Sequence, residues 1–246
     1  MNDETNAFFA PFEYYDGDKI VGVDVDIMNL VGEKLGKKVV FENTDFGVII
    51  DNVKKGKKYD CGAAGITITD ARKELVDFSD TYFTSIQYIV FKNGDFTKAG
   101  TTTDGVDYVL WSDLAGKKIG VQTDTTSDIY VDGEINGWEG ENDGELSNTG
   151  CEEVRFDNSE VAIDALGITV DVVVVDKLPA EYMVNKNSNI SCFALYYDAE
   201  TATAEDYAIA VTKGNKELLD AINLVLEELG NDGINDLVAK HLGITG

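Results

Sequence analysis

The chain has 246 residues, of which 43% are hydrophobic and 24 are glycine, an ordinary composition for a globular protein of one large domain or two lobes. Its 46 acidic and 20 basic residues give a formal net charge of −26. Because binding to phosphates needs clusters of lysine and arginine, this charge argues against nucleic acid or an anionic membrane surface as a partner.

No stretch of the sequence is suited to crossing a bilayer. The longest apolar runs, such as Val172–Val175, fall far short of the roughly 20 residues required. Residues 1–4 (MNDE) lack the basic and apolar regions of a signal peptide. We therefore expect either a cytoplasmic protein or an exported one whose export signal is absent from this sequence.

The scarcity of histidine and cysteine excludes several kinds of catalytic site. The single histidine, His241, lies near the end of the chain, so no Ser-His-Asp or Cys-His arrangement is expected. No cysteine or histidine cluster has zinc spacing, and no glycine-rich phosphate loop occurs. The acidic stretch 139–144 (EGENDG) lacks the closing glutamate of a calcium loop and is predicted to be a solvated surface turn. We expect no metal and no cofactor.

The three cysteines do not identify the redox compartment. Cys61 sits in a strand-like run and is expected to be buried as a small hydrophobic side chain. Cys151 and Cys192 lie in the same later region, and the sequence leaves open whether they pair.

The first part of the chain alternates between helical and strand-like patterns. An apolar stripe after Asp24 predicts a helix that Asp24 caps and Gly36 ends. Short connections between alternating strands and helices favour a parallel sheet. The further elements expected here are a strand over 38–42, a short helix that Asp45 caps and Gly56 ends, and a strand over 59–64.

A second series of strands and helices follows the polar stretch 93–105. Two such series in one chain imply two lobes, and ligands bind at the carboxyl ends of the strands in sheets of this kind. The expected elements are a strand over 118–122, a helix after the cap cluster 125–127, a helix over 159–166 capped by Asn158, a strand over 170–175, a helix opened by Pro179, and a C-terminal helix ended by Gly230.

The most informative segment is a predicted strand-to-helix junction. Residues 64–72 (AGITITDAR) gather small residues, threonine hydroxyls and Arg72 without apolar periodicity, and 76–79 (VDFS) follow. Exposed N–H groups, hydroxyl donors and a planar guanidinium together suit a carboxylate ligand. Asp176 directly follows the apolar strand of the second series, so both charged residues fall at strand ends.

Seven segments, in the same order along the chain, resemble the polar amino-acid-binding proteins of ABC transporters. That group belongs to the extracytoplasmic solute-binding proteins of family 3 and includes the glutamine-binding proteins. The segments are 6–14 (NAFFAPFEY), 21–27 (VGVDVDI), 45–46 (DF), 65–72 (GITITDAR), 76–80 (VDFSD), 114–121 (LAGKKIGV) and 174–176 (VVD).

The resemblance implies an α/β, two-lobed periplasmic-binding-protein-like fold of type II, each lobe being a mostly parallel sheet flanked by helices. Lobe 1 would hold residues 1–85 and 206–246, and lobe 2 would hold residues 86–205. Two hinge crossovers, near 82–86 and 203–207, would join the lobes.

The resemblance also implies which residues bind the ligand carboxylate. Arg72 would clamp the α-carboxylate, and Thr67 and the Gly65 backbone would add hydrogen bonds from the same lobe. Thr126, at a helix N-terminus in the other lobe, would donate its backbone N–H to that carboxylate, with Thr125 beside it.

The remaining assignments from the resemblance concern the rest of the ligand. Asp176 would accept hydrogen bonds from the α-ammonium. Phe9 and Phe46 match the aromatic residues that sandwich the aliphatic part. Asn6 and Gln122 fall where the family varies its contacts to the ligand side chain.

The implied function is that of a non-enzymatic carrier. The protein would capture a free polar amino acid between two closing lobes and deliver it to the permease of an ABC transporter, as a monomer in the periplasm or as a cell-surface lipoprotein. The neutral amides of Asn6 and Gln122 favour a ligand such as glutamine, whereas Asp124 favours a cationic one. Two alternatives use the same fold: an enzyme similar to the cyclohexadienyl dehydratases, and a ligand-binding sensor domain.

Two features depart from the family pattern. Only residues 1–5 precede the first matching segment, and they are not strand-like, so the first strand of the family is expected to be missing or truncated. Asp124 stands where the family usually has glycine. Its carboxylate is expected to repel a ligand carboxylate unless it points outward or contacts a cationic side chain.

Overall fold

The computed structural model describes residues 1–138 and 144–243, and contacts divide the chain into two compact units. Unit 1 comprises Met1–Thr84 and Glu205–Gly246, and unit 2 comprises Ser85–Ala204. Within the described part of the chain, no helix is long and apolar enough to span a membrane. Residues 139–143 of the acidic stretch lie outside the described residues, so the surface turn there stays a prediction.

Unit 1 is built on a five-stranded mixed sheet with the order β5-β1-β6-β16-β7. Strand β1 is parallel to β5 and β6, whereas β16 is antiparallel to β6 and β7. A separate three-stranded sheet has the order β2-β3-β4. The strands are β1 (Asn2–Thr5), β2 (Phe8–Phe9), β3 (Glu13–Asp16), β4 (Lys19–Val21), β5 (Val40–Asn43), β6 (Cys61–Gly62), β7 (Asp77–Phe78) and β16 (Ala210–Val211).

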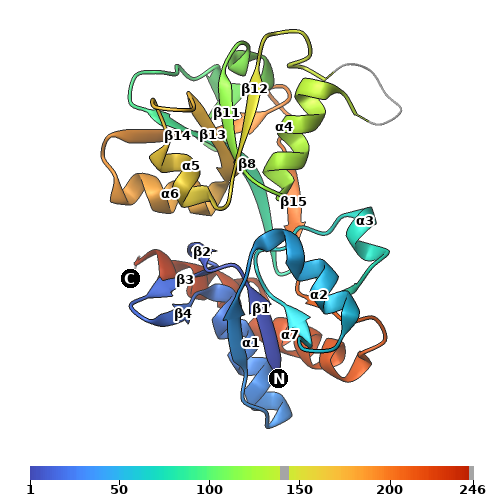
Figure 1. Ribbon diagram of the computed structural model, residues 1–246. Helices are drawn as coiled ribbons and strands as arrows, with labels where there is room; N and C mark the ends of the chain where they lie inside the picture. The colour runs from blue at the N-terminus through green and yellow to red at the C-terminus, as the bar shows by residue number, and fades with distance from the viewer. Residues whose placement is uncertain (139–143, 244–246) are drawn as a thin grey trace. The chain divides into compact units, whose positions relative to one another are not determined.

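Helices α1, α2 and α7 form the main helical layers of unit 1, and the short α3 lies on a loop beside α2 (Figure 1). Helix α1 packs along α7, while α2 contacts β1, β6 and β16. The helical elements are α1 (Val23–Leu35), the 3-10 turn η1 (Phe46–Val48), α2 (Ile49–Lys55), α3 (Asp70–Lys73) and α7 (Lys216–Leu242).

The expectation that the first strand is missing was wrong. Strand β1 lies inside the sheet, paired on both sides, and Asp3, Glu4 and Thr5 are fully buried. No apolar alternation marks this strand, because its side chains are polar and are held by hydrogen bonds instead. The Ala63 N–H donates to Asp3 Oδ1 at 3.0 Å, and Asn52 Nδ2 donates to Glu4 Oε1 at 2.8 Å.

The start of α1 differs from the prediction, whereas its end agrees. Gly22, not Asp24, holds the N-cap position, at φ 144, where a Cβ would lie 1.9 Å from the Phe12 carbonyl oxygen. Asp24 lies within the first turn and points its carboxylate into unit 1. The helix ends at Gly36, as expected from the sequence.

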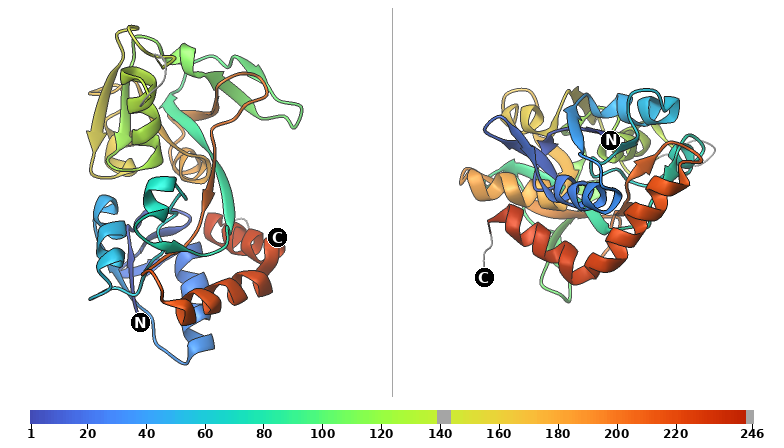
Figure 2. Two further views of the ribbon diagram at one scale, coloured as in Figure 1. Left: turned by 90° about the vertical axis from the view of Figure 1, so that its right-hand side faces the viewer. Right: turned by 90° about the horizontal axis from the view of Figure 1, so that it is seen from below.

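The other helix boundaries show where local signals are weak. Asp45 precedes the 3-10 turn η1 but makes no side-chain cap, and the predicted helix is split into η1 and α2, which does end at Gly56. Gly230 (φ 56, ψ −174) interrupts α7 but does not end it, so the helix bends there and continues to Leu242 (Figure 2).

Unit 2 contains a mixed sheet with the order β12-β11-β13-β8-β14-β10-β9, and β15 pairs with β8. Helices α5 and α6 cover one face of this sheet and α4 covers the other (Figure 1). The elements within unit 2 are β9 (Gly100–Thr101), β10 (Asp107–Leu110), η2 (Trp111–Leu114), β11 (Lys118–Gln122), α4 (Thr126–Asn136), β12 (Glu152–Phe156), α5 (Ser159–Asp164), β13 (Val172–Asp176), α6 (Lys177–Lys186) and β14 (Ile190–Tyr196). Strands β8 (Phe83–Lys92) and β15 (Ala204–Tyr207) cross the boundaries between the units, so part of each belongs to unit 1.

The core of unit 2 explains why its elements were easier to predict. Strand β13 is buried along its whole length, and side chains such as Trp111, Ile119 and Val172 form one apolar cluster. Pro179 is the third residue of α6, not its first, because Asp176 already ends β13 and occupies the N-cap position. The predicted α/β class is confirmed, with parallel and antiparallel pairs combined in each main sheet.

The cysteines do not form disulfides. Cys61, Cys151 and Cys192 are all free thiols, and Cys61 is buried as expected. Burial raises the pKa of the Cys192 thiol to about 12, so this group is neutral at physiological pH.

Candidate functional site

The Arg72 side chain is held in place by its own loop. Thr69 caps the short helix α3 by accepting the Arg72 backbone N–H at 3.2 Å. Arg72 Nη1 donates to the Thr67 carbonyl oxygen at 2.9 Å, and its guanidinium carbon lies 5.4 Å from the centre of the Phe46 ring. Phe46 in turn packs against the apolar cluster that contains Ile49 and Ile66. The planar cation is therefore positioned before any ligand binds.

A buried glutamate that the sequence analysis missed lies beside Thr67. The Thr67 hydroxyl donates to Glu205 Oε2 at 2.5 Å, and both residues are 5% exposed. Glu205 belongs to β15, far from Thr67 in the sequence, so only the fold brings the two together. The Thr67 hydroxyl proton therefore points toward Glu205.

Gly65 has a left-handed backbone conformation that is fixed by a buried acid. Its φ is 53°, and its N–H donates to Asp24 Oδ2 at 2.8 Å. The Tyr82 hydroxyl donates to Asp24 Oδ1 at 2.7 Å. Burial raises the pKa of Asp24 to about 6, although hydrogen bonds from Gly65, Tyr82 and Glu13 act in the opposite direction. A Cβ at position 65 would lie only 2.8 Å from Phe9 Cε1, so Phe9 packs directly over this glycine.

Phe9 and Asn6 are both held by neighbours within unit 1. The Phe9 ring stacks on Phe12, with 6.0 Å between the ring centroids. Asn6 is 3% exposed, and its Nδ2 donates to the Thr44 carbonyl oxygen at 2.8 Å. Within unit 1 the structure thus links Arg72, Thr67 and Phe46 in one group and places Gly65 against Phe9. We call these residues, together with Asn6, the unit 1 half-site.

In unit 2, Thr125 of the predicted cap cluster 125–127 caps α4, which begins at Thr126. Thr125 Oγ1 accepts the Asp128 N–H at 3.4 Å, and the Thr125 hydroxyl donates to the Gln122 carbonyl oxygen at 2.7 Å. Thr126 is the first residue of the helix and is buried. The first backbone N–H groups of a helix have no acceptor within the helix and lie at its positive end, which favours an anion.

Gln122 and Asp124 flank this cap. Gln122 Oε1 accepts the Ser159 N–H at 3.2 Å, so the amide of Gln122 supports the first turn of α5. Asp124 is exposed, adopts φ 64, and donates its backbone N–H to Asp128 Oδ2 at 2.7 Å. The left-handed conformation explains why glycine is usual at this position in the resembled family.

Asp176 is anchored by a glutamine that the sequence analysis also missed. Asp176 is 4% exposed, and its Oδ1 accepts Gln87 Nε2 at 2.8 Å. Gln87 is fully buried, and its Oε1 accepts the Ser127 hydroxyl at 2.6 Å. The sequence signal for this contact was a glutamine within the apolar run 86–91 of β8. We call Thr125, Thr126, Gln122 and Asp176 the unit 2 half-site.

The charged residues predicted to bind the two ends of a ligand belong to different units, Arg72 to unit 1 and Asp176 to unit 2. Among the residues that the structure describes, no group of three or more His, Cys, Asp or Glu side chains is placed to hold a metal ion. Unit 1 provides a fixed cation beside aromatic rings, and unit 2 provides a buried anion and a helix N-terminus. Such groups suit binding of a zwitterion.

The comparisons with known proteins agree with this chemistry. The family model described as bacterial extracellular solute-binding proteins, family 3, matches residues 4–244. The arginine-binding extracellular protein ArtP of Bacillus subtilis is 29% identical over 233 residues, which cover 93% of this chain and 80% of ArtP.

Two solved structures of an ancestral arginine-binding protein are also similar to this chain. The form bound to arginine is 37% identical, covers 97% of this chain and 96% of its own, and has a TM-score of 0.77. The form bound to glutamine is 36% identical, and the match covers 98% of this chain and 97% of that structure's chain, with a TM-score of 0.77.

Proposed function

Because the chain belongs to the bacterial extracellular solute-binding proteins of family 3, we propose that it captures a free polar amino acid and delivers it to the permease of an ABC transporter. The family consists of binding proteins, so the chain is not an enzyme of the dehydratase type considered from the sequence. We further propose that it acts as a monomer in the periplasm or as a surface lipoprotein.

The observation that carries the proposal is the fixed guanidinium of Arg72 over the Phe46 ring. A guanidinium offers two parallel N–H donors that match a carboxylate, and a preset orientation reduces the entropy lost on binding. In this proposal Arg72 binds the α-carboxylate, and the N–H of Thr126 at the α4 N-terminus donates to the same group. Asp176 accepts hydrogen bonds from the α-ammonium.

The proposal makes the two units the two lobes of the family fold, with crossings after Thr84 and after Ala204. One zwitterion that binds to a cation in one lobe and an anion in the other favours the closed arrangement of the protein. Closure is then driven by the differential affinity of the ligand for the closed state.

The structure refines the roles proposed for two residues of unit 1. The Gly65 N–H is bound to Asp24, so its carbonyl oxygen is the backbone group proposed to contact the ligand, as an acceptor for the α-ammonium. The Thr67 hydroxyl donates to Glu205, so we propose that Thr67 acts mainly by orienting Arg72 through its carbonyl oxygen. Phe9 and Phe46 are proposed to cover the aliphatic part of the ligand.

Glutamine and arginine are the first candidates for the ligand. ArtP is named for arginine, and the ancestral protein has been solved with each of the two amino acids. The neutral amides of Asn6 and Gln122 favour glutamine, because a buried cationic head group generally needs a carboxylate. Asp124 is exposed, which reduces both its repulsion of a ligand carboxylate and its attraction for a cationic side chain.

A thermal-shift screen tests the proposed function. The purified chain is melted in the presence of each of the twenty amino acids, ornithine, citrulline and cystine, since a ligand of the folded state raises the unfolding temperature by mass action. We expect a polar amino acid to produce the largest shift and calorimetry to give 1:1 binding. Arg72→Ala serves as the control, with an unchanged unfolding temperature in the absence of ligand and no shift in its presence. If no amino acid shifts the wild-type protein, the proposed function is wrong.

A further inference from the structure

Gln87 occupies the middle of a hydrogen-bonded chain inside unit 2. Its Nε2 donates to Asp176 Oδ1 at 2.8 Å, and its Oε1 accepts the Ser127 hydroxyl at 2.6 Å. Gln87 is fully buried, and Asp176 and Ser127 are each at most 4% exposed. The chain therefore joins the end of β13 to the first turn of α4.

The register of the sheet brings the two residues together. Strand β8 runs antiparallel to β13, with Gln87 directly opposite Asp176. The backbone of Gln87 is fixed separately, because its N–H donates to Thr203 Oγ1 at 2.9 Å. The side-chain amide is thus not needed to hold β8 in place, and its two hydrogen bonds serve the residues at its ends.

The direction of the two hydrogen bonds fixes the orientation of the amide. Ser127 donates to the oxygen, so the nitrogen must face Asp176, and a carboxylate accepts that donor well. Asp176 makes no side-chain cap of α6, although it holds the N-cap position. The hydrogen bond from Gln87 therefore acts directly on the position of the Asp176 carboxylate.

We propose that Gln87 is a positioning residue for ligand binding, which aims the Asp176 carboxylate at the ligand ammonium and holds it at a set separation from the α4 N-terminus. The inference rests on the proposed function. A zwitterion has its carboxylate and its ammonium at a fixed spacing. Because Gln87 links Asp176 rigidly to the α4 N-terminus, these two protein groups do not have to rearrange when the ligand binds.

The test compares Gln87→Met and Gln87→Glu with wild-type protein, titrated by calorimetry with L-glutamine and with L-arginine. Methionine preserves the volume but removes both hydrogen bonds, so affinity is expected to fall by at least about tenfold, the cost of one hydrogen bond to a charged group. Val173→Ala is the matched control, since Val173 is buried in β13 and pairs with Val90 of β8. It lowers stability but is expected to leave affinity within about twofold.

Gln87→Glu separates positioning from simple packing. The introduced carboxyl group has the size of the amide that it replaces and can still accept the Ser127 hydroxyl. When it is ionised, it repels the Asp176 carboxylate. At lower pH the two carboxyls share a proton, which restores a donor toward Asp176. The affinity of this variant is therefore expected to rise at least tenfold between about pH 8 and pH 5, relative to wild type.

The outcomes distinguish the two proposals. If wild-type protein binds an amino acid and Gln87→Met binds it within about twofold as tightly, or if Gln87→Glu has the pH profile of wild type, the positioning role is wrong while the proposed function stands. If wild-type protein binds neither amino acid and none from the screen, the proposed function fails, and the positioning role with it.

Discussion

Replacement of Asp24 by asparagine is expected to change how the stability of the protein depends on pH. Asp24 is fully buried, accepts the Gly65 N–H and the Tyr82 hydroxyl, and has a pKa raised from 3.8 to about 6. Asparagine preserves the shape of the side chain and can still accept from Gly65 while its amide donates to the Tyr82 oxygen. The substitution therefore removes the titration with little change in packing.

The magnitude follows from the raised pKa. The folded state binds the proton more tightly than the unfolded chain, so the stabilisation from the protonated acid is fully present below about pH 4 and is lost as the pH rises through about 6. A shift of this size corresponds to about 3 kcal/mol in total, of which roughly 2 kcal/mol is lost between pH 4 and pH 7. Burial and the charge of Asp24 also raise the pKa of Asp3, so the substitution lowers that pKa and changes the comparison in the same direction.

The assay is urea unfolding of wild-type protein and Asp24→Asn without ligand, at steps from pH 4 to pH 7. Fluorescence and circular dichroism are recorded together, because two units can unfold separately. The difference in free energy of unfolding between the two proteins is expected to move by about 2 kcal/mol in favour of the variant as the pH rises. If the difference in free energy of unfolding stays constant over this range, the pKa of Asp24 is not raised by folding, and the reasoning is refuted.

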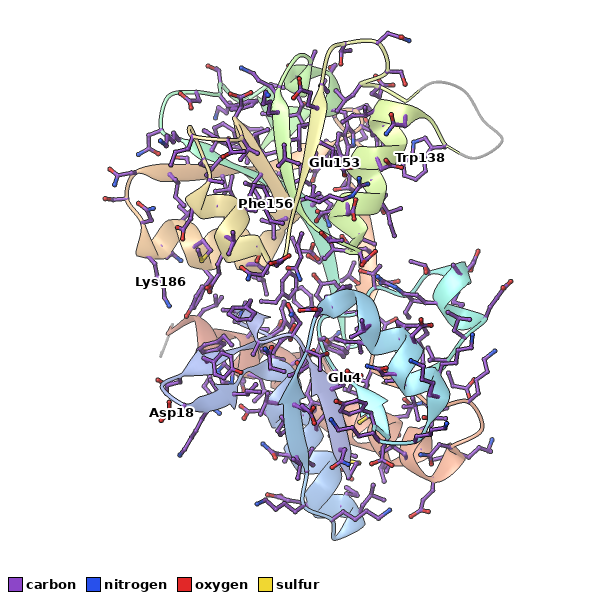
Figure 3. All side chains as sticks on the ribbon, viewed as in Figure 1. Glu4, Asp18, Trp138, Glu153, Phe156 and Lys186 are labelled. Carbon is purple, nitrogen blue, oxygen red and sulfur yellow. The ribbon has the colours of Figure 1, made fainter. Side chains whose placement is uncertain are left out.

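Three further substitutions test individual contacts. Arg72→Lys removes the planar fork at a half-buried position, so calorimetry is expected to show at least about tenfold weaker amino-acid binding with little change in unfolding temperature. Gly65→Ala places a Cβ 2.8 Å from Phe9 at φ 53, so thermal unfolding is expected to show a loss of about 1–2 kcal/mol, and binding is expected to weaken because Phe9 must shift. Arg155→Gln removes the guanidinium that pairs with Glu153 at 2.6 Å and with Asp128 at 2.8 Å. Burial and the neighbouring Asp128 raise the pKa of Glu153, which is labelled in Figure 3, to about 8. Urea unfolding is expected to show a loss of about 2–4 kcal/mol that is larger at pH 9 than at pH 6, since Glu153 keeps its proton at the lower pH.

The sequence predicted best those elements whose signal is local. The strand over 118–122, the cap at Thr125 and the cap at Asn158 all agree with the structure. In each case one side chain and its nearest neighbours determine the local structure, so a window of a few residues contains the information. The junction that contains Arg72 was recognised for the same reason.

The sequence failed where polar residues are buried by long-range contacts. Strand β1 has the sequence NDET, which reads as a surface segment, and only pairing with β5 and β6 on both sides makes it a core strand. Gln87 and Glu205 were missed for a related reason. Their partners, Asp176 and Thr67, lie 89 and 138 residues away, and no periodicity reports a hydrogen bond at that separation.

The two half-sites are held by different chemistry, and this difference yields a prediction for binding. Gly65 in unit 1 is fixed by Asp24, an acid that titrates near pH 6. Asp176 in unit 2 is fixed by the neutral amide of Gln87, which does not titrate. Neither the carboxylate nor the ammonium of a free amino acid titrates between pH 5 and pH 7.5.

A change in affinity centred near pH 6 is therefore expected to originate in unit 1, because Glu153, an acid of unit 2 whose pKa is strongly raised, titrates near pH 8. Protonation of Asp24 weakens its hold on Gly65, so calorimetry of wild-type protein is expected to show affinity falling a few-fold below about pH 6. Asp24→Asn is expected to flatten this profile, whereas Gln87→Met is expected to lower affinity at every pH and keep its shape. If Gln87→Met flattens the profile and Asp24→Asn does not, the titrating group lies in unit 2 and this assignment is wrong.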